Sequence, residues 1–207
     1  MAEPHDMILI LDFGSQYTQI IARRVREAHV YCEIVPYNHD LGAYRGRNVR
    51  GYILSGGPAS LSDPGSPRLA PEFYDTNLPV LGICYGLQLL AERFGGRLVA
   101  SSTREYGRSR LSVVEADDLL AGIPATSNVW MSHGDSIAVM PPGFRIIGST
   151  ETLAAAAIAW PERKLYGVQF HPEVHHTDEG RRILDNFLFD VCGVKGDWTT
   201  EAFIDSA

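Results

Sequence analysis

Residues 79–90 read PVLGICYGLQLL, and the organisation of the chain on either side can be understood from them. The apolar run Val80–Ile83 ends abruptly at Cys84, and leucines then recur at helical spacing. This pattern predicts a buried strand, a tight turn and a helix, with the cysteine at the turn. Gly82 and Gly86 flank the cysteine as Gly-x-Cys-x-Gly, which is the cysteine form of the nucleophile elbow.

Cys84 has two possible roles at such a turn. The turn would hold the sulfur at the N-terminus of a helix, where the helix dipole favours the thiolate, the form that attacks carbon. Most free cysteines are instead small buried core residues, and that alternative stays open for Cys84 taken alone. The glycine frame around it favours a catalytic nucleophile.

The composition indicates one soluble globular domain. The chain has 207 residues, of which 45% are hydrophobic and 21% charged, enough for a full core. The net charge is -7, and no long run of lysine or arginine indicates a nucleic-acid surface. We therefore expect a small molecule or another protein as partner, and no nucleic acid.

Membrane association and disulfide bonding are also not expected. No apolar stretch reaches the roughly 18 residues that a membrane span needs. The three cysteines, Cys32, Cys84 and Cys192, are too few and too scattered for a disulfide framework. They indicate a reducing, cytoplasmic setting.

The first half of the chain alternates strands with helices. Expected strands are Met7–Leu11, Tyr31–Val35, Gly51–Leu54 and Pro79–Ile83, and a helix with one apolar face follows the first of them. This spacing predicts an α/β fold with a mostly parallel sheet covered on both faces. Ligands of such sheets bind beyond the carboxyl ends of the strands, where Cys84 lies.

The second half has a different character. From about Gly95 the sequence predicts short strands separated by turns, which form an antiparallel or mixed extension of the sheet. A final helix is expected over residues 177–192, with Asp178 and Glu179 in its first turn. The expected short strands are Arg97–Val99, Leu111–Glu115, Val129–Met131, Ile137–Val139, Arg145–Gly148, Ala154–Trp160 and Leu165–Phe170.

His171 is the histidine best placed to serve Cys84. It closes an apolar strand, and Pro172 keeps it extended, so Glu173 can turn back to its ring. A nucleophilic cysteine needs such a base, and the base needs an orienting acceptor. Two alternatives are a surface His-Glu pair and a metal site formed with His175 and His176. Pro172 argues against the helix that would align metal ligands here.

Residues Ser55–Pro58 read Ser-Gly-Gly-Pro at another strand end. Glycines there let backbone N–H groups point into a site and hold either a phosphate or an oxyanion. A phosphate-binding Walker loop would need Gly-Lys-Ser/Thr, which is absent. The oxyanion interpretation is therefore favoured, with a plain turn as the alternative.

Three separated motifs together resemble a known family. Gly-Ile-Cys-Tyr-Gly-Leu-Gln at 82–88, Ser-Gly-Gly-Pro at 55–58 and Gln-Phe-His-Pro-Glu at 169–173 resemble the signature blocks of class I, triad-type, glutamine amidotransferases. Further blocks resemble the branch of that family that supplies ammonia for the ATP-dependent amination of xanthosine monophosphate to GMP. These blocks lie at 8–17, 104–107, 130–135 and 173–177, and the resemblance runs from about residue 7 to residue 198.

The resemblance implies a flavodoxin-like fold and roles for named residues. Cys84 would attack the glutamine amide, His171 would carry the proton, and Glu173 would orient and stabilise the imidazole. Backbone N–H groups of Gly57 and Tyr85 would form the oxyanion hole. Glutamine would be held by Gly56, Gln88, Ser132, His133, Gly134 and Asp135.

The resemblance also implies a division of labour with a second domain. Residues 1–195 would be the amidotransferase domain, and residues 196–207 the start of a linker to an ATP-pyrophosphatase (synthetase) domain, fused or separate. No cofactor and no metal are expected in this domain, whereas ATP and magnesium would bind the synthetase domain. The Ser-Gly-Gly at Ser55 is not followed by the aspartate of a pyrophosphatase loop. The full-length enzyme is expected to be a homodimer.

Three other functions are considered. The same chemistry could serve another acceptor, as in anthranilate or carbamoyl-phosphate synthesis, although residues 130–135 argue against it. A non-catalytic module could keep the fold, but the intact set of Cys84, His171 and Glu173 argues against that. A cysteine peptidase could use the same elbow, and a glutamine analogue would then fail to label Cys84.

Overall fold

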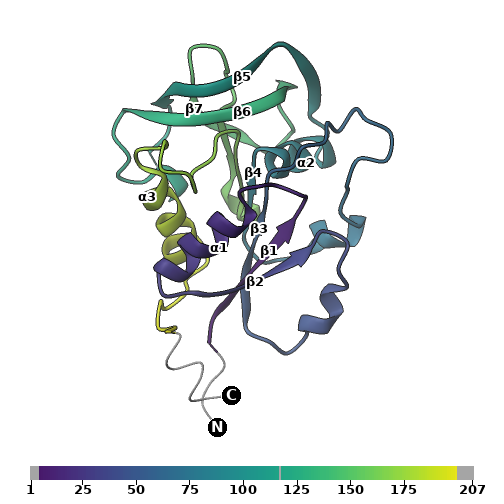
Figure 1. The fold of residues 1–207 in the computed structure, drawn as a ribbon, viewed down its shortest axis with the longest axis vertical. Coiled ribbons are helices and arrows are strands. Elements are labelled where there is room, and N and C mark those ends of the chain that lie inside the picture. Colours follow the sequence, from purple (N-terminus) through teal and green to yellow (C-terminus); the bar gives the residue numbers. More distant parts are fainter. Residues whose placement is uncertain (1–4, 117, 200–207) are drawn as a thin grey trace.

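The computed structural model describes residues 5–116 and 118–199, in which one mixed sheet of nine strands carries helices on both faces (Figure 1). The sheet order is β2-β1-β3-β4-β9-β8-β7-β5-β6. The strands are β1 Met7–Asp12, β2 Tyr31–Pro36, β3 Val49–Leu54, β4 Val80–Ile83, β5 Arg97–Val113, β6 Thr126–Val139, β7 Arg145–Ser149, β8 Ala157–Trp160 and β9 Leu165–Val168. The α-helices are α1 Thr18–Glu27, α2 Tyr85–Arg93 and α3 Gly180–Asp185, and α3 continues as a π-helical stretch, Asn186–Val191.

The parallel half of the sheet has the order β2-β1-β3-β4-β9, and each neighbouring pair in it is parallel. This is the 2-1-3-4-5 order of flavodoxin-like folds, so the predicted fold class is confirmed. In such an order the carboxyl ends of β3, β4 and β9 lie next to one another. The residues that follow these three strands therefore meet at one edge of the sheet.

Alternating side chains of the parallel strands build two cores. Ile8, Ile10 and Ile53 pack in the cluster that contains the buried faces of α1 and α3. Leu11 and Leu54 belong to the cluster that contains α2. Because neighbouring residues of a strand point to opposite faces, an almost continuously apolar strand is buried on both sides.

The antiparallel half differs from the prediction in the length of its strands. Arg97–Val99 and Leu111–Glu115 were expected as separate strands, but they are the two ends of β5, and β6 likewise joins the two strands expected at 129–139. The two strands pair from Arg97↔Val139 to Ser112↔Thr126, with an irregularity between Ala100 and Glu105. Backbone pairing continues through residues without an apolar pattern. A prediction from hydrophobic patterning therefore underestimates the length of the strands in such a two-stranded ribbon. Figure 1 shows this ribbon crossing the upper end of the molecule.

The final helix also begins later than predicted. Residues 177–179 lie outside it, and α3 starts at Gly180. Thr177 and Asp178 instead bond to β6: the Thr177 hydroxyl accepts the Trp130 N–H at 3.1 Å, and the Asp178 N–H donates to Asn128 O at 3.1 Å. Asp178 therefore does not serve the first turn of the helix.

The described end of the chain packs on the domain. Trp198 is buried, its backbone N–H donates to His29 O at 2.9 Å, and its ring lies 5.8 Å from that of Tyr31. It falls within the expected linker, 196–207, of which residues 200–207 lie outside the described residues. In the described ranges, every helix is too short or too polar to cross a bilayer.

The first turn of α2 is pressed against β3 and β4, and glycines make this possible. A Cβ on Gly86 would lie 2.5 Å from Leu54 O, and one on Gly82 would lie 2.5 Å from the Gly86 carbonyl. Gly167 is less restricted, because its added Cβ would meet the Leu87 side chain at 3.0 Å. The backbone atoms that a Cβ at Gly82 or Gly86 would meet cannot move aside as easily as side-chain atoms can.

We predict that Gly86→Ala lowers the free energy of unfolding by more than about 3 kcal/mol, the upper end of ordinary overpacking costs. Gly167→Ala, the matched substitution, should cost about 1–3 kcal/mol, because its Cβ would meet Leu87 side-chain atoms at 3.0–3.1 Å rather than backbone at 2.5 Å. Urea unfolding followed by circular dichroism measures both. Equal costs for the two variants would contradict this account of the α2 packing.

Candidate active site

Cys84 lies at the turn between β4 and α2 in a strained backbone conformation. Its φ is +53° and its ψ is −103°, so a residue with a side chain occupies a region that normally favours glycine. The Cys84 N–H donates to Val168 O at 2.8 Å, which ties the turn to the end of β9. The predicted elbow is therefore formed, with the cysteine at the first position before the helix.

A backbone carbonyl and a side-chain amide are among the polar groups that contact the Cys84 sulfur. The thiol donates to Ser132 O, with Sγ 3.5 Å from the oxygen, and the Gln169 side-chain Nε2 lies 3.6 Å from Sγ. Only 5% of Cys84 is exposed. Cys84 is thus almost fully buried, and it lines two cavities of the molecule.

His171 and Glu173 form a buried pair beside Cys84. His171 Nδ1 lies 2.7 Å from Glu173 Oε1, and the Glu173 side chain is fully buried. The other carboxylate oxygen, Oε2, has no hydrogen-bond partner among the described residues. The contact between Glu173 and the His171 imidazole that the sequence predicts is present in the structure.

Burial alone would lower the pKa of His171, since it disfavours the imidazolium. The Glu173 carboxylate and a hydrogen bond with the Cys84 side chain act in the opposite direction and outweigh it. The result is a pKa raised to about 10, so the ring is protonated at neutral pH.

The backbone of His171 is fixed by Thr177 and by β6. The His171 N–H donates to Trp130 O at 3.0 Å. The Thr177 hydroxyl donates to His171 O at 2.6 Å while accepting the Trp130 N–H. One buried hydroxyl therefore joins the histidine segment to the antiparallel ribbon. The Tyr17 ring adds an edge contact, with its centroid 5.0 Å from that of the imidazole.

The Ser-Gly-Gly-Pro turn lies against these residues. A Cβ on Gly56 would be 3.2 Å from His171 Cε1 and 3.6 Å from Cys84 Cβ, so a side chain there would press on the imidazole ring. Gly57 and Tyr85 line the same cavity as Cys84. Tyr85 is the first residue of α2, and N–H groups at a helix start have no partner within the helix.

A cavity of about 460 Å³ opens beside the sulfur and collects most of the predicted glutamine-binding residues. Gln88 is almost fully buried on α2, and its Nε2 donates to Asp135 O at 3.0 Å. His133 Nδ1 lies 3.1 Å from the same oxygen. The predicted residues that line this cavity are Gln88, Ser132, His133, Gly134 and Asp135. Gly56 is not one of the lining residues and lies instead against His171 and Cys84.

The environment of His133 disfavours its charged form. Burial lowers the pKa of His133, and the Glu105 carboxylate and Asp135 O only partly offset this effect. His133 Nε2 lies 3.5 Å from Glu105 Oε2. A neutral imidazole can donate one hydrogen bond and accept another in the cavity.

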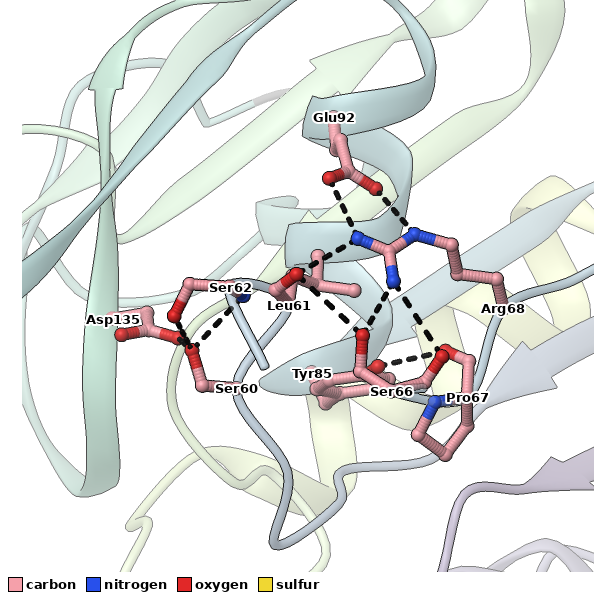
Figure 2. A network of polar contacts seen from close by, with 9 residues as sticks. All are labelled: Ser60, Leu61, Ser62, Ser66, Pro67, Arg68, Tyr85, Glu92 and Asp135. Atoms are coloured by element: carbon pink, nitrogen blue, oxygen red, sulfur yellow. Dashed lines mark hydrogen bonds and ion pairs between the residues drawn. The ribbon is translucent and has the colours of Figure 1, made fainter. Parts of the chain in front are cut away.

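The loop after β3 forms one wall of this cavity, and a network of polar contacts holds it (Figure 2). Ser60 Oγ donates to Asp135 Oδ2 at 2.5 Å, which joins the loop to β6. Arg68 contacts both carboxylate oxygens of Glu92 on α2, at 3.0 and 3.2 Å, and donates to Leu61 O at 2.8 Å. The wall is therefore attached to two elements of the domain.

A second cavity, of about 300 Å³, also borders Cys84. It is lined by Gly14–Tyr17, by Cys84 and His171, and by the Ser-Gly-Gly-Pro turn. Cys84, Gly57, Pro58 and Ser132 border both cavities, so the sulfur stands between them.

The metal alternative receives no geometric support within the described ranges. His171 and Glu173 bond to each other, and the His175 ring packs against that of His176 with centroids 3.7 Å apart. In the part of the chain that is described, no group of three or more His, Cys, Asp and Glu residues could hold a metal ion.

The family model described as Glutamine amidotransferase class-I matches residues 9–191. The chain belongs to this family. The match spans all nine strands except the first residues of β1, and includes the predicted triad.

Relatives and solved structures agree with this membership. The chain is 51% identical over 205 residues to a glutamine-hydrolysing GMP synthase of Symbiobacterium thermophilum, and 52% identical over 202 residues to that of Thermomicrobium roseum. It covers only 40% and 38% of the lengths of these two proteins.

Among solved structures, a Thermoplasma acidophilum protein described as a candidate component of GMP synthase superimposes with a TM-score of 0.83 at 32% identity, with both chains covered completely. A glutamine amidotransferase from Thermotoga maritima has a TM-score of 0.70 at 17% identity, covering 92% of this chain and 99% of its own. The latter likeness concerns the fold alone.

Several residues of the site were not assigned roles from the sequence. Gln169 and Thr177 stand inside the quoted motifs at 169–173 and 173–177, so their presence there was a usable signal. Tyr17 also lies in a quoted block. Glu105 likewise lies in the quoted block at 104–107. Ser60 approaches the site only through the loop after β3, and nothing in its local sequence indicates it.

Thr177→Val removes the hydroxyl that joins His171 to Trp130 at nearly constant volume. We expect the free energy of unfolding to fall by about 1–3 kcal/mol, because two buried backbone groups lose a partner. Thr177→Ser keeps the hydroxyl and should recover most of this loss. Urea denaturation measures both variants, and equal stabilities for the two would contradict the assigned bonding.

Proposed function

We propose that this chain is the glutamine-hydrolysing part of a GMP synthase, with Cys84, His171 and Glu173 as its catalytic triad. One observation carries the proposal. A cysteine held at a strand-to-helix elbow meets a buried His–Glu pair, in a chain about half identical to glutamine-hydrolysing GMP synthases. The released ammonia would be used by the part of those proteins that this chain does not cover.

Glutamine would bind in the 460 Å³ cavity with its side-chain amide at Cys84. The polar residues Ser132, His133 and Asp135, which line this cavity, would hold its α-amino and α-carboxylate groups, with Gln88 and Gly134 completing the wall. Asp135 is already hydrogen-bonded to Ser60, so binding there would also fix the loop after β3.

The first half of the reaction forms a thioester. The Cys84 thiolate attacks the amide carbon, and a sulfur–carbon bond forms while the carbonyl oxygen becomes an oxyanion. Backbone N–H groups of Gly57 and Tyr85 would stabilise that oxyanion, each worth about 3 kcal/mol in the transition state. His171 then donates its proton to the amide nitrogen, the carbon–nitrogen bond breaks, and ammonia leaves.

The second half hydrolyses the thioester. His171, now neutral, accepts a proton from water as the water oxygen bonds to the thioester carbon. The carbon–sulfur bond breaks, glutamate is released, and the thiolate and the imidazolium are restored. Glu173 accepts the bond from Nδ1 throughout, so Nε2 is the nitrogen that carries the moving proton.

The partner of this reaction would be an ATP-pyrophosphatase domain, fused or separate, that aminates xanthosine monophosphate. We assign ATP and magnesium to that domain, as the resemblance to the family implies. The full-length enzyme would be a cytoplasmic homodimer. Amidotransferase function for another acceptor is less well supported, since the relatives compared are GMP synthases.

Ammonia release from glutamine tests the proposal directly. We expect release that is lost in Cys84→Ala, is slow for this chain alone, and rises when the separately made synthetase half, ATP and xanthosine monophosphate are added. Release that depends on Cys84 but is indifferent to the partner would keep the chemistry and reject the acceptor. Absence of release in both conditions would reject the proposed reaction.

The raised pKa of His171 gives a pH prediction. The proton donor is the imidazolium, so kcat/KM should fall as pH rises through the pKa of His171, on the alkaline side. Glu173→Gln removes the charge that favours the imidazolium, so this alkaline decline should move to lower pH, by about 1–3 units. A pH series of kcat/KM measures the change.

Asp190→Asn is the matched control for the pH experiment, because it removes an exposed carboxylate near the end of the last helix. Its profile should match that of the unsubstituted protein. If the alkaline decline of kcat/KM occurs at the same pH in Glu173→Gln as in the unsubstituted protein, Glu173 does not set the protonation of His171.

A further inference from the structure

We propose that Gln169 is an additional catalytic residue, whose side-chain N–H holds the Cys84 sulfur in its thiolate form. The assignment rests on the proposed function, but it concerns a property of the sulfur that can be measured without glutamine. The contact joins Gln169 Nε2 and Cys84 Sγ across 3.6 Å, within the range of hydrogen bonds to sulfur.

Gln169 is placed for this contact by the end of β9. It is fully buried, and its backbone N–H donates to Ala156 O at 2.8 Å, which fixes its position beside β8. A fully buried amide side chain needs partners for its hydrogens. In the described part of the chain, the hydrogen bonds found for this side chain are those to Cys84 and Gln88.

The orientation of the Gln169 amide follows from a fixed acceptor. Asp135 O is a backbone carbonyl and can only accept, so the Gln88 group 3.0 Å from it must be the NH₂. That same Gln88 NH₂ lies 3.4 Å from the Gln169 amide, which must present its oxygen there. The NH₂ of Gln169 is thereby directed to the sulfur. If the Gln169 amide were turned over, its NH₂ would face the Gln88 NH₂, and its oxygen would face the Cys84 sulfur.

Ser132 O and the Gln169 N–H respond differently to ionisation of the sulfur. The neutral thiol donates to Ser132 O, but a thiolate has no hydrogen to donate and would face that carbonyl oxygen unfavourably. The Gln169 N–H remains a donor in both states, and hydrogen bonds to a charged acceptor are the stronger ones. Gln169 therefore favours the thiolate over the thiol.

Alkylation of Cys84 by iodoacetamide as a function of pH tests this assignment, since only the thiolate reacts. Burial raises the pKa of Cys32 to about 11 and that of Cys192 to about 12, so both should stay unreactive at lower pH. Mass spectrometry of the Cys84 peptide identifies the site of labelling.

The other titratable groups around the sulfur stay the same in the variants, so a shift of the profile is assigned to the Gln169 donor. These groups are Tyr17, Asp63, Tyr85, Tyr106, His133, Asp135 and His171, which line the two cavities.

We expect Gln169→Met, which keeps the length of the side chain and removes the donor, to move the midpoint of the alkylation profile upward by about 1 unit. At lower pH this corresponds to an approximately tenfold slower alkylation, because one pH unit is tenfold in thiolate. Gln169→Asn keeps the amide but withdraws it from the sulfur, so it should shift the midpoint in the same direction. In glutamine hydrolysis, kcat should fall with little change in KM.

Asn186→Leu is the matched control. Asn186 is a second buried amide, and its Nδ2 donates to Leu119 O and Ala121 O at 3.0 Å each, in contacts that do not involve the sulfur. This variant should lose stability without moving the alkylation midpoint. Unshifted midpoints in folded Gln169→Met and Gln169→Asn would overturn the assignment. If the unsubstituted protein releases no ammonia, the proposed function fails while the alkylation result still decides the role of Gln169.

Discussion

The close approach of the first turn of α2 to β3 and β4 is the constraint on which the remaining structure depends. Gly82 and Gly86 allow backbone to meet backbone there, and the chain can then reverse into a helix immediately after β4. At that reversal Cys84 adopts the strained backbone conformation, with a positive φ. The bond from its N–H to Val168 O joins the turn to β9. The position of the histidine that follows β9 is thus set by the same turn.

The antiparallel ribbon of β5 and β6 contacts the residues that follow the parallel strands and completes the site with them. β6 accepts the His171 N–H at Trp130 O, accepts the Cys84 thiol at Ser132 O, and meets the loop after β3 at Asp135. The parallel half alone would leave the ends of its strands open to solvent. The ribbon closes one side of that edge, and this closure accounts for a cysteine and a histidine that are both almost fully buried. Reaction in a site with little water strengthens every charge interaction in it.

Much of the fold and of the predicted triad could be read from the sequence because the signals were local. The elbow is encoded within residues 82–86, and the His171–Glu173 contact spans two residues beside a proline. Residues 126–139 were harder to predict, because a strand without apolar alternation is stabilised by pairing with a distant partner. The start of α3 was missed for a similar reason: Thr177 and Asp178 bond to β6 rather than to the helix. The Ser60–Asp135 contact joins residues 75 apart and has no local signature.

The electrostatics of the site favour charge separation over neutrality. Glu173 is fully buried and one of its oxygens lacks a partner among the described residues, so an ionised carboxylate there is costly unless a positive charge lies beside it. An imidazolium at 2.7 Å supplies that charge, and the raised pKa of His171 expresses the same coupling. Replacing the carboxylate by a neutral group would remove the charge that keeps the His171 ring protonated. The fold therefore gives up some stability to a buried carboxylate, and that carboxylate keeps the His171 ring protonated at neutral pH.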